Sequence, residues 1–256
     1  MEKLYFRKTY LFIGLAIILI VIVAVYINRS YAHIYNTIDS VALTSPDKLR
    51  TYLIANNMAA KSTLTYVALG DSLSSGVGAN KYEESFPYLL AQYLAGNDYQ
   101  VTLRNHSAPG AKTADLLTGL LPGAIKDNPD IITLLIGTND VHSNISQKDF
   151  SAGYEQILKR LSTETKAKIY IINLPFIGAT DLILPPHNYL LDQRTKKFNA
   201  IIKNLAIKYQ VKYIDLYTPT ETLFKKPGSY YSADFFHPSA EGYKIWADLI
   251  YADLGQ

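Results

Sequence analysis

The sequence contains no cysteine in its 256 residues. This absence excludes disulfide scaffolds, zinc knuckles, a thiol nucleophile and a lipidated N-terminal cysteine as a membrane anchor. The length of the chain and its 48% hydrophobic residues support one globular domain with a full-sized core. Any nucleophilic chemistry in this protein is therefore not carried by cysteine.

A basic surface is missing from most of the chain as well. The formal net charge is +3, and residues 1–29 account for all of it through Lys3, Arg7, Lys8 and Arg29 against Glu2. The remaining residues carry equal numbers of basic and acidic side chains. Nucleic acid is therefore not an expected partner.

An uncharged apolar run, YLFIGLAIILIVIVAVYI, extends from Tyr10 to Ile27. At about 1.5 Å per residue, a helix of this length spans roughly 27 Å, which nearly matches the hydrocarbon core of a bilayer. Basic residues outnumber acidic ones before the run, and Arg29 alone follows it closely. The positive-inside rule then places residues 1–9 in the cytoplasm and residues after Arg29 outside the cell membrane. We predict a single-pass transmembrane signal anchor over residues 10–27.

The alternative to an anchor is a cleaved secretory signal, whose apolar part is usually about 7–15 residues long. Ser30-Tyr31-Ala32 loosely matches a cleavage site, and cleavage there would release a secreted protein. The length of the run and the position of Arg29 favour the uncleaved anchor.

Residues 28–63 are predicted to form a juxtamembrane stalk. Within them, Ser45-Pro46-Asp47 is typical of a helix start, with a hydroxyl cap, a proline at the first helical position and an acid in the first turn. Leu49, Tyr52 and Leu53 would give this helix one apolar face. We therefore expect a short helix in the stalk.

Short apolar runs after the stalk have the composition of buried strands. They are Leu64–Leu69, Tyr99–His106, Ile131–Ile136, Lys168–Leu174 and Val211–Ile214. Segments with the apolar period of amphipathic helices lie between them, and a last helix follows Pro238 with Ser239 as its cap. This alternation predicts an α/β domain over residues 64–256, with a five-stranded parallel sheet covered by helices on both faces.

Polar residues and glycines follow these strands, at the edge where parallel sheets bind ligands. The first strand leads into Gly70-Asp71-Ser72-Leu73, the second ends close to Gly110, and the third ends in Gly137-Thr138-Asn139-Asp140. Asp234-Phe235-Phe236-His237-Pro238 precedes the last helix. Taken alone, Gly-Asp-Ser is equally typical of an ordinary turn.

Together, these four segments resemble the sequence blocks of the SGNH hydrolase family, also called GDSL lipases and acylhydrolases. Ser72, Gly110, Asn139 and His237 stand in the order that this family requires. The resemblance covers roughly residues 65–254. It implies a flavodoxin-like, three-layer α/β/α sandwich that hydrolyses carboxylic esters with neither a metal nor an organic cofactor.

The resemblance and the needs of acyl transfer assign roles to these residues. Ser72 would attack the ester carbonyl, His237 would remove its proton, and Asp234 would orient the imidazole, so these three form the predicted catalytic triad. The backbone N–H groups of Ser72 and Gly110 and the side-chain amide of Asn139 would form the oxyanion hole.

Asp71 and Asp140 are predicted to be local braces for the turn after Ser72 and for the loop of Asn139, respectively. The remaining sequence features give weaker evidence of function. No histidine pair has the spacing of a metal site, so we expect none. The apolar connection from Pro175 to Tyr189 is either a loop packed on the domain or a surface that accepts an acyl chain.

We therefore expect a membrane-anchored, extracytoplasmic serine esterase or lipase that acts on a small-molecule or lipid ester. The alternative within hydrolases is an O-acetylesterase that acts on cell-wall or exported polysaccharide. A third interpretation, a catalytically silent membrane-associated binding module, is disfavoured because Ser72, Asp234 and His237 are all present. The sequence leaves the acyl chain, the alcohol and the oligomeric state open.

Overall fold

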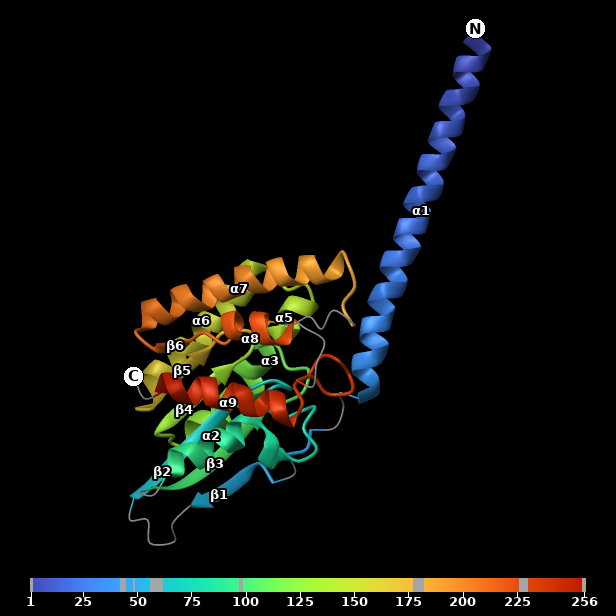
Figure 1. Cartoon of the computed structure of the whole chain (residues 1–256). Coiled ribbons are helices and arrows are strands. Elements are labelled where there is room, and N and C mark those ends of the chain that lie inside the picture. Colours follow the sequence, from blue (N-terminus) through green and yellow to red (C-terminus); the bar gives the residue numbers. More distant parts are fainter. Residues whose placement is uncertain are drawn as a thin grey trace.

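The structure is a computed structural model that describes residues 2–41, 45–47, 49–55, 62–96, 99–176, 182–225 and 230–254. Strands in these ranges form one sheet in the order β1-β3-β2-β4-β5-β6. Helices lie on both sides of the sheet, and a long N-terminal helix extends away from the domain (Figure 1). The architecture is a three-layer α/β/α sandwich.

All five strands predicted from the sequence are present and parallel, with small shifts at their ends. They are β2 (Ser62–Gly70), β3 (Tyr99–Ser107), β4 (Ile131–Leu135), β5 (Lys168–Ile172) and β6 (Lys212–Ile214). Every residue of β4 is buried, because helices cover both faces of the sheet there. The order β3-β2-β4-β5-β6 is the flavodoxin-like order, so the predicted fold class is confirmed.

Two layers of helices enclose the sheet. One layer contains α2 (Phe86–Ala95) and α9 (Ala240–Leu254), which pack against each other. The other contains α4 (Leu121–Lys126), α6 (Gln147–Glu164) and α7 (His187–Tyr209). Short helical elements complete the connections: η1 (Tyr82–Glu84), α3 (Thr113–Asp115), η2 (Leu116–Leu120), α5 (Thr138–His142) and α8 (Tyr217–Phe224).

The helical pattern in the sequence predicts the buried faces correctly. Phe150, Tyr154 and Ile157 of α6 are buried, as are Tyr243 and Trp246 of α9. At the start of α9, Ser239 acts as the predicted cap, because its Oγ accepts a hydrogen bond from Gly242 N–H at 3.2 Å.

The short helix predicted in the stalk is wrong, since residues Thr51–Ala55 form β1, an edge strand antiparallel to β3. Ser45 therefore does not cap a helix there, and Asp47 is not the acid of a first helical turn. Its carboxylate instead accepts hydrogen bonds from Arg50 N–H at 2.9 Å, Tyr52 Oη at 2.7 Å and Asn105 Nδ2 at 2.5 Å. The bond from Asn105 ties the segment to β3, on which β1 pairs. The sheet therefore begins earlier in the chain than the predicted boundary at residue 64.

The N-terminal helix α1 (Glu2–Val41) contains the whole apolar run and continues beyond it. Its segment Lys8–Ile34 is long and apolar enough to cross a membrane, and the most apolar part of this segment is not covered by the domain. The first part of the predicted stalk is therefore a continuation of α1. A membrane span and a signal sequence both fit this helix.

The predicted apolar connection Pro175 to Tyr189 lies partly outside the described residues, which omit 177–181. Of its described part, Leu182 and Ile183 are buried, whereas Leu184 is exposed. The connection leads from the end of β5 into α7.

The alternation of buried and exposed residues in β1 generates a test that separates a strand from a helix. Ile54 is 6% exposed and Leu53 is 66% exposed. We predict that Ile54→Ala lowers the free energy of unfolding by about 2–4 kcal/mol, because it leaves a cavity, whereas Leu53→Ala has little effect. Denaturant unfolding in detergent, followed by the fluorescence of the single tryptophan, measures both. A larger loss for Leu53→Ala would contradict the strand.

Candidate active site

The turn after β2 holds Ser72 at the carboxyl end of the sheet. Gly70 has no room for a side chain, since a Cβ there would lie 2.3 Å from the Leu135 carbonyl oxygen of the neighbouring strand. The chain then turns sharply, with hydrogen bonds from Ser75 N–H to the Asp71 carbonyl at 3.0 Å and from Val77 N–H to the Ser72 carbonyl at 3.1 Å. This tight turn fixes the Ser72 side chain next to the loop that precedes α9.

Ser72, His237 and Asp234 form one hydrogen-bonded chain. His237 Nε2 lies 2.9 Å from Ser72 Oγ, and His237 Nδ1 lies 2.6 Å from Asp234 Oδ2. All three residues are buried. Because a carboxylate only accepts, Nδ1 carries the proton in the bond to Asp234, which leaves Nε2 as the acceptor for the Ser72 hydroxyl.

Asp234 is held in the ionised form. Burial alone would raise its pKa, but the hydrogen bond and charge of His237, with further hydrogen bonds, outweigh burial and lower the pKa to about 2. Those further bonds all end on Oδ1, from Ser232 Oγ at 2.7 Å and from the N–H groups of Phe236 and His237 at 2.9 Å. The loop therefore folds around the carboxylate that orients its own histidine.

The residues predicted for the oxyanion hole come from two neighbouring loops. Gly110 is exposed and has a φ of +78°, in the left-handed region that favours glycine. Asn139 lies in α5, and its Nδ2 donates a hydrogen bond to the Ala111 carbonyl at 3.0 Å. This bond brings the Asn139 amide beside Gly110. The second N–H of the amide remains for another acceptor.

Asp140 also connects these two loops. Its carboxylate is buried and accepts hydrogen bonds from the backbone N–H of Thr113, at 3.0 Å, and from the Thr113 hydroxyl. Thr113 begins α3, the first helical turn after Gly110. Asp140 thus connects the Asn139 loop to the Gly110 loop at the carboxyl ends of the strands.

Asp71 has a very different environment from Asp234. Its Oδ1 accepts one hydrogen bond, from Leu73 N–H at 3.0 Å, and its buried Oδ2 has no partner among the described residues. Burial raises the pKa of Asp71 to about 7, opposed by the bond from Leu73 and supported by the charge of Asp140. A substantial fraction of Asp71 is therefore protonated near neutral pH.

His142 lies at the end of α5 and packs near the loop that carries His237. Its ring contacts Phe236 edge to face, with centroids 5.2 Å apart, and Phe236 in turn contacts the His237 ring at 4.9 Å. Burial lowers the pKa of His142 to about 4, and the charges of His237 and Arg194 act in the same direction. Neutral His142 therefore forms part of the wall around His237. In the part of the chain that the structure describes, no group of three or more His, Asp or Glu residues is placed to hold a metal ion.

Gly78 and Ser232 are the site residues that the sequence pattern misses. Gly78 has a φ of +96°, and a Cβ there would lie 2.4 Å from the Pro238 carbonyl oxygen and 2.8 Å from His237 Cβ. Ser232 donates to Asp234. The only signal for Gly78 is its place in the glycine- and serine-rich stretch after Ser72, which does not reveal its neighbour.

Comparison with known proteins finds similar sequences and folds among lipases and esterases. The model of the GDSL-like lipase/acylhydrolase family matches residues 68–245. The spore germination lipase LipC of Bacillus licheniformis is 28% identical over 216 residues, which are 74% of this chain and 96% of that protein. The crystal structure of the lipase/acylhydrolase from Enterococcus faecalis superposes with a TM-score of 0.61 at 23% identity, covering 75% of this chain and 95% of the other. Axe2, an acetylxylan esterase from Geobacillus stearothermophilus, has a TM-score of 0.62 at 18% identity, with 78% and 97% covered.

The close approach at Gly78 predicts that this position tolerates no side chain. Gly78→Ala should push the Pro238 backbone and His237 away from Ser72, and a displacement of about 1 Å can reduce reactivity by about 10²-fold. We expect the rate at which a fluorophosphonate labels Ser72 to fall by about tenfold or more. Gly119→Ala is the matched control, because a Cβ there meets nothing within 4 Å. Equal labelling rates in the two variants would contradict the role of Gly78.

Proposed function

Because the chain belongs to the GDSL-like lipase/acylhydrolase family and is a carboxylic-ester hydrolase, we propose that Ser72, His237 and Asp234 are its catalytic triad. The observation that carries this proposal is the chain of two hydrogen bonds, 2.9 Å and 2.6 Å long, that joins the three side chains. A serine hydroxyl is a poor nucleophile without an adjacent base, and His237 is in position to act as that base.

In the first step, Ser72 Oγ attacks the ester carbonyl while its proton passes to His237 Nε2. The imidazolium that forms is stabilised by Asp234, whose low pKa keeps it ionised next to that charge. His237 then gives the proton to the departing alcohol oxygen as the C–O bond breaks, which leaves an acyl group on Ser72. Water then attacks the acyl carbon while His237 takes a proton from it. The bond between the acyl carbon and Ser72 Oγ breaks, His237 returns the proton to Oγ, and the carboxylic acid leaves.

Negative charge develops on the carbonyl oxygen in both steps. The proposed donors are the backbone N–H groups of Ser72 and Gly110 and the Asn139 amide, whose position beside Ala111 supports the assignment. Asp140 supports the site by connecting the two donor loops through Thr113. Asp71 supports the turn that carries Ser72.

The proposed substrate is a carboxylic ester with an acyl chain, as expected of an esterase or lipase. The O-acetylesterase alternative is supported only by the shared fold with Axe2. A silent binding module is disfavoured because the three side chains are not merely present but hydrogen-bonded to one another.

The test of the triad uses the full chain in detergent. We predict that it hydrolyses p-nitrophenyl esters, that Ser72→Ala abolishes both hydrolysis and fluorophosphonate labelling, and that Asn139→Ala lowers kcat by about 10²–10³-fold with the fold intact. Lys197→Ala, an exposed position on α7, is the control. Activity that persists on octanoyl esters selects the lipase, and a strict acetyl preference selects the alternative. The absence of hydrolysis from acetyl to octanoyl, with an unreactive Ser72, would disprove the proposal.

We further propose that α1 anchors the enzyme, with residues 1–9 in the cytoplasm and the catalytic domain outside. The uncovered apolar segment of α1 and the basic residues before it support this topology. We predict that the protein sediments with the membrane fraction of cells and that external protease degrades the domain in intact cells. Full protection of the domain would contradict the orientation, and recovery of the domain in the medium would indicate cleavage.

A further inference from the structure

One face of α1 packs on the domain just after the apolar run ends. The carbonyl oxygen of Ile27 lies 3.3 Å from His187 Nε2, and the rings of Tyr31 and His187 are 5.6 Å apart. Ser30 and Ile34 are buried. These positions recur every three or four residues, so they share one side of the helix. His187 begins α7, whose N-terminal end lies near α1 while the rest of the helix extends away from it (Figure 1).

The same face of α1 reaches the proposed active site. Ile34 forms a small apolar cluster with Leu182 and Ile183, and Phe236 packs against that cluster. Phe236 directly precedes His237, and their rings are in contact. Two contacts on α1, at Ile27 and at Ile34, therefore hold the site in a defined position relative to the apolar run.

This arrangement sets the distance between the proposed active site and a bilayer that contains the apolar run of α1. If Ile27 marks the edge of the hydrocarbon core, Ile34 lies about 10 Å farther along the helix axis. The headgroup layer on each side of a bilayer is roughly 5–7 Å thick. Phe236 and the neighbouring His237 would then lie just beyond the lipid headgroups.

Exposed apolar side chains lie close in sequence to His187, where α1 contacts α7. Leu184 is 38% exposed, Tyr189 65% and Leu190 56%, and together we call them the membrane-proximal surface. Tyrosine is enriched at membrane interfaces, where its ring is buried and its hydroxyl is hydrated.

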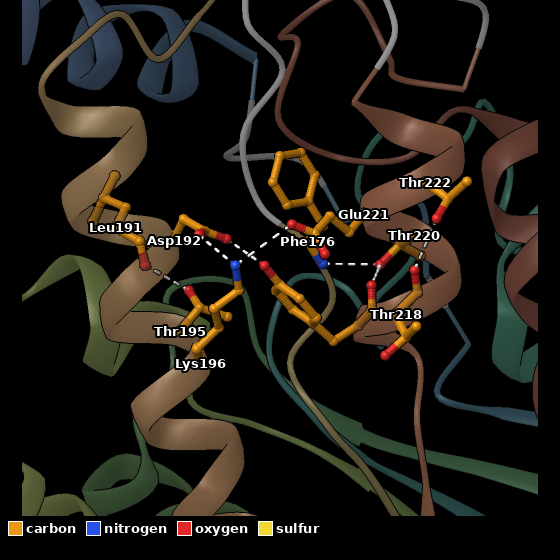
Figure 2. Close-up of polar contacts among 10 residues, drawn as sticks. Phe176, Leu191, Asp192, Thr195, Lys196, Thr218, Thr220, Glu221 and Thr222 are labelled. Atoms are coloured by element: carbon orange, nitrogen blue, oxygen red, sulfur yellow. Dashed lines mark hydrogen bonds and ion pairs between the residues drawn. The ribbon is translucent and has the colours of Figure 1, made fainter.

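An exposed flank of α7 makes polar contacts with α8. Figure 2 shows Asp192 and Lys196 of α7 facing Glu221 of α8, with Lys196 Nζ 2.8 Å from Asp192 and 3.5 Å from Glu221. On the α8 side, Thr220 Oγ1 accepts a hydrogen bond from Phe176 N–H at 2.9 Å. The buried side of α7 carries Phe198, Ile202 and Leu205. The exposed Tyr189 and Leu190 therefore lie on its outer side.

We propose that the membrane-proximal surface inserts into the headgroup layer of the membrane that α1 spans, and that the site takes an acyl-ester lipid from this bilayer. The inference rests on the proposed function for the identity of the site. The ester is then part of a lipid in the bilayer rather than an ester dissolved in water. Continuity of this surface with the apolar run of α1 is the reason.

Position in the bilayer can be measured directly because the chain has no cysteine. We would introduce Leu190→Cys or Ile207→Cys into the full chain, label each with the dye NBD and reconstitute it in vesicles of phosphatidylcholine and phosphatidylglycerol. Ile207 is the matched control, since it is 68% exposed on the same helix at the end far from α1. We expect brominated phosphatidylcholine to quench the dye at position 190 and not at position 207. Equal quenching, or none at position 190, would overturn the inference.

The activity test compares two sources of ester for the same reconstituted enzyme. We expect the double variant Tyr189→Ser/Leu190→Ser to hydrolyse a diacyl lipid in its own vesicle about fivefold more slowly or worse, because less apolar surface enters the interface. Its rate on soluble p-nitrophenyl acetate should match that of the wild type, and Ile207→Ser should match it on both substrates. Equal lipid rates for the double variant and wild type, or no lipid hydrolysis by the wild type, would refute the lipid source alone. No activity of the wild type on p-nitrophenyl acetate would refute the proposed function instead.

Discussion

The proposed chemistry depends on the docking of the loop before α9 against the turn after β2. Ser72 and His237 are far apart in the chain, and a hydrogen bond between them exists only while these two segments touch. The absence of a side chain at Gly78 lets the Pro238 backbone approach, and Tyr243 Oη donates to the Val77 carbonyl at 2.7 Å. Tyr243 lies on α9 and is fully buried in the core of the domain. The alignment of Ser72 with His237 is therefore set by core packing as well as by the polar groups themselves.

Two buried carboxylates beside Ser72 show how environment separates the roles of identical groups. Asp234 accepts four hydrogen bonds, and its pKa falls to about 2. Asp71 accepts one from Leu73, and burial leaves its pKa near 7. A permanently ionised group suits the stabilisation of an imidazolium, whereas a second full negative charge close to Ser72 would oppose the oxyanion. Partial neutralisation of Asp71 therefore favours the charge that develops in the proposed reaction.

The local sequence pattern was sufficient for the parallel strands and the amphipathic helices. A strand buried on both faces appears as a short apolar run, and a helix buried on one side appears as an apolar repeat. The pattern also predicted that Ser72, Gly110 and Asn139 lie near one edge of the sheet, because they follow strands whose carboxyl ends share that edge. Within the described ranges, Asp234 and His237 follow no strand directly, and only the resemblance of the segment before α9 pointed to them. The local pattern failed at β1, where Ser45-Pro46-Asp47 has the composition of a helix start. The strand forms because of contacts with residues distant in sequence: Asn105 donates a hydrogen bond to Asp47, and the free edge of β3 pairs with β1. The role of Gly78 was hidden for the same reason, because its neighbour Pro238 is distant in sequence.

The connection between α1 and the domain has a consequence beyond tethering. A helix joined to its domain by a free linker would let the site rotate and face any direction, and substrate would then arrive from solution as readily as from lipid. Here the stripe from Ile27 to Ile34 packs against His187, Leu182 and Ile183, which removes most of that freedom. Once the apolar run lies in a bilayer, the height of Phe236 above it follows from the pitch of the helix. Holding a reactive group at a fixed height replaces a three-dimensional search with encounters inside one thin layer, so the proposed anchoring through α1 would itself favour esters that reside in the membrane.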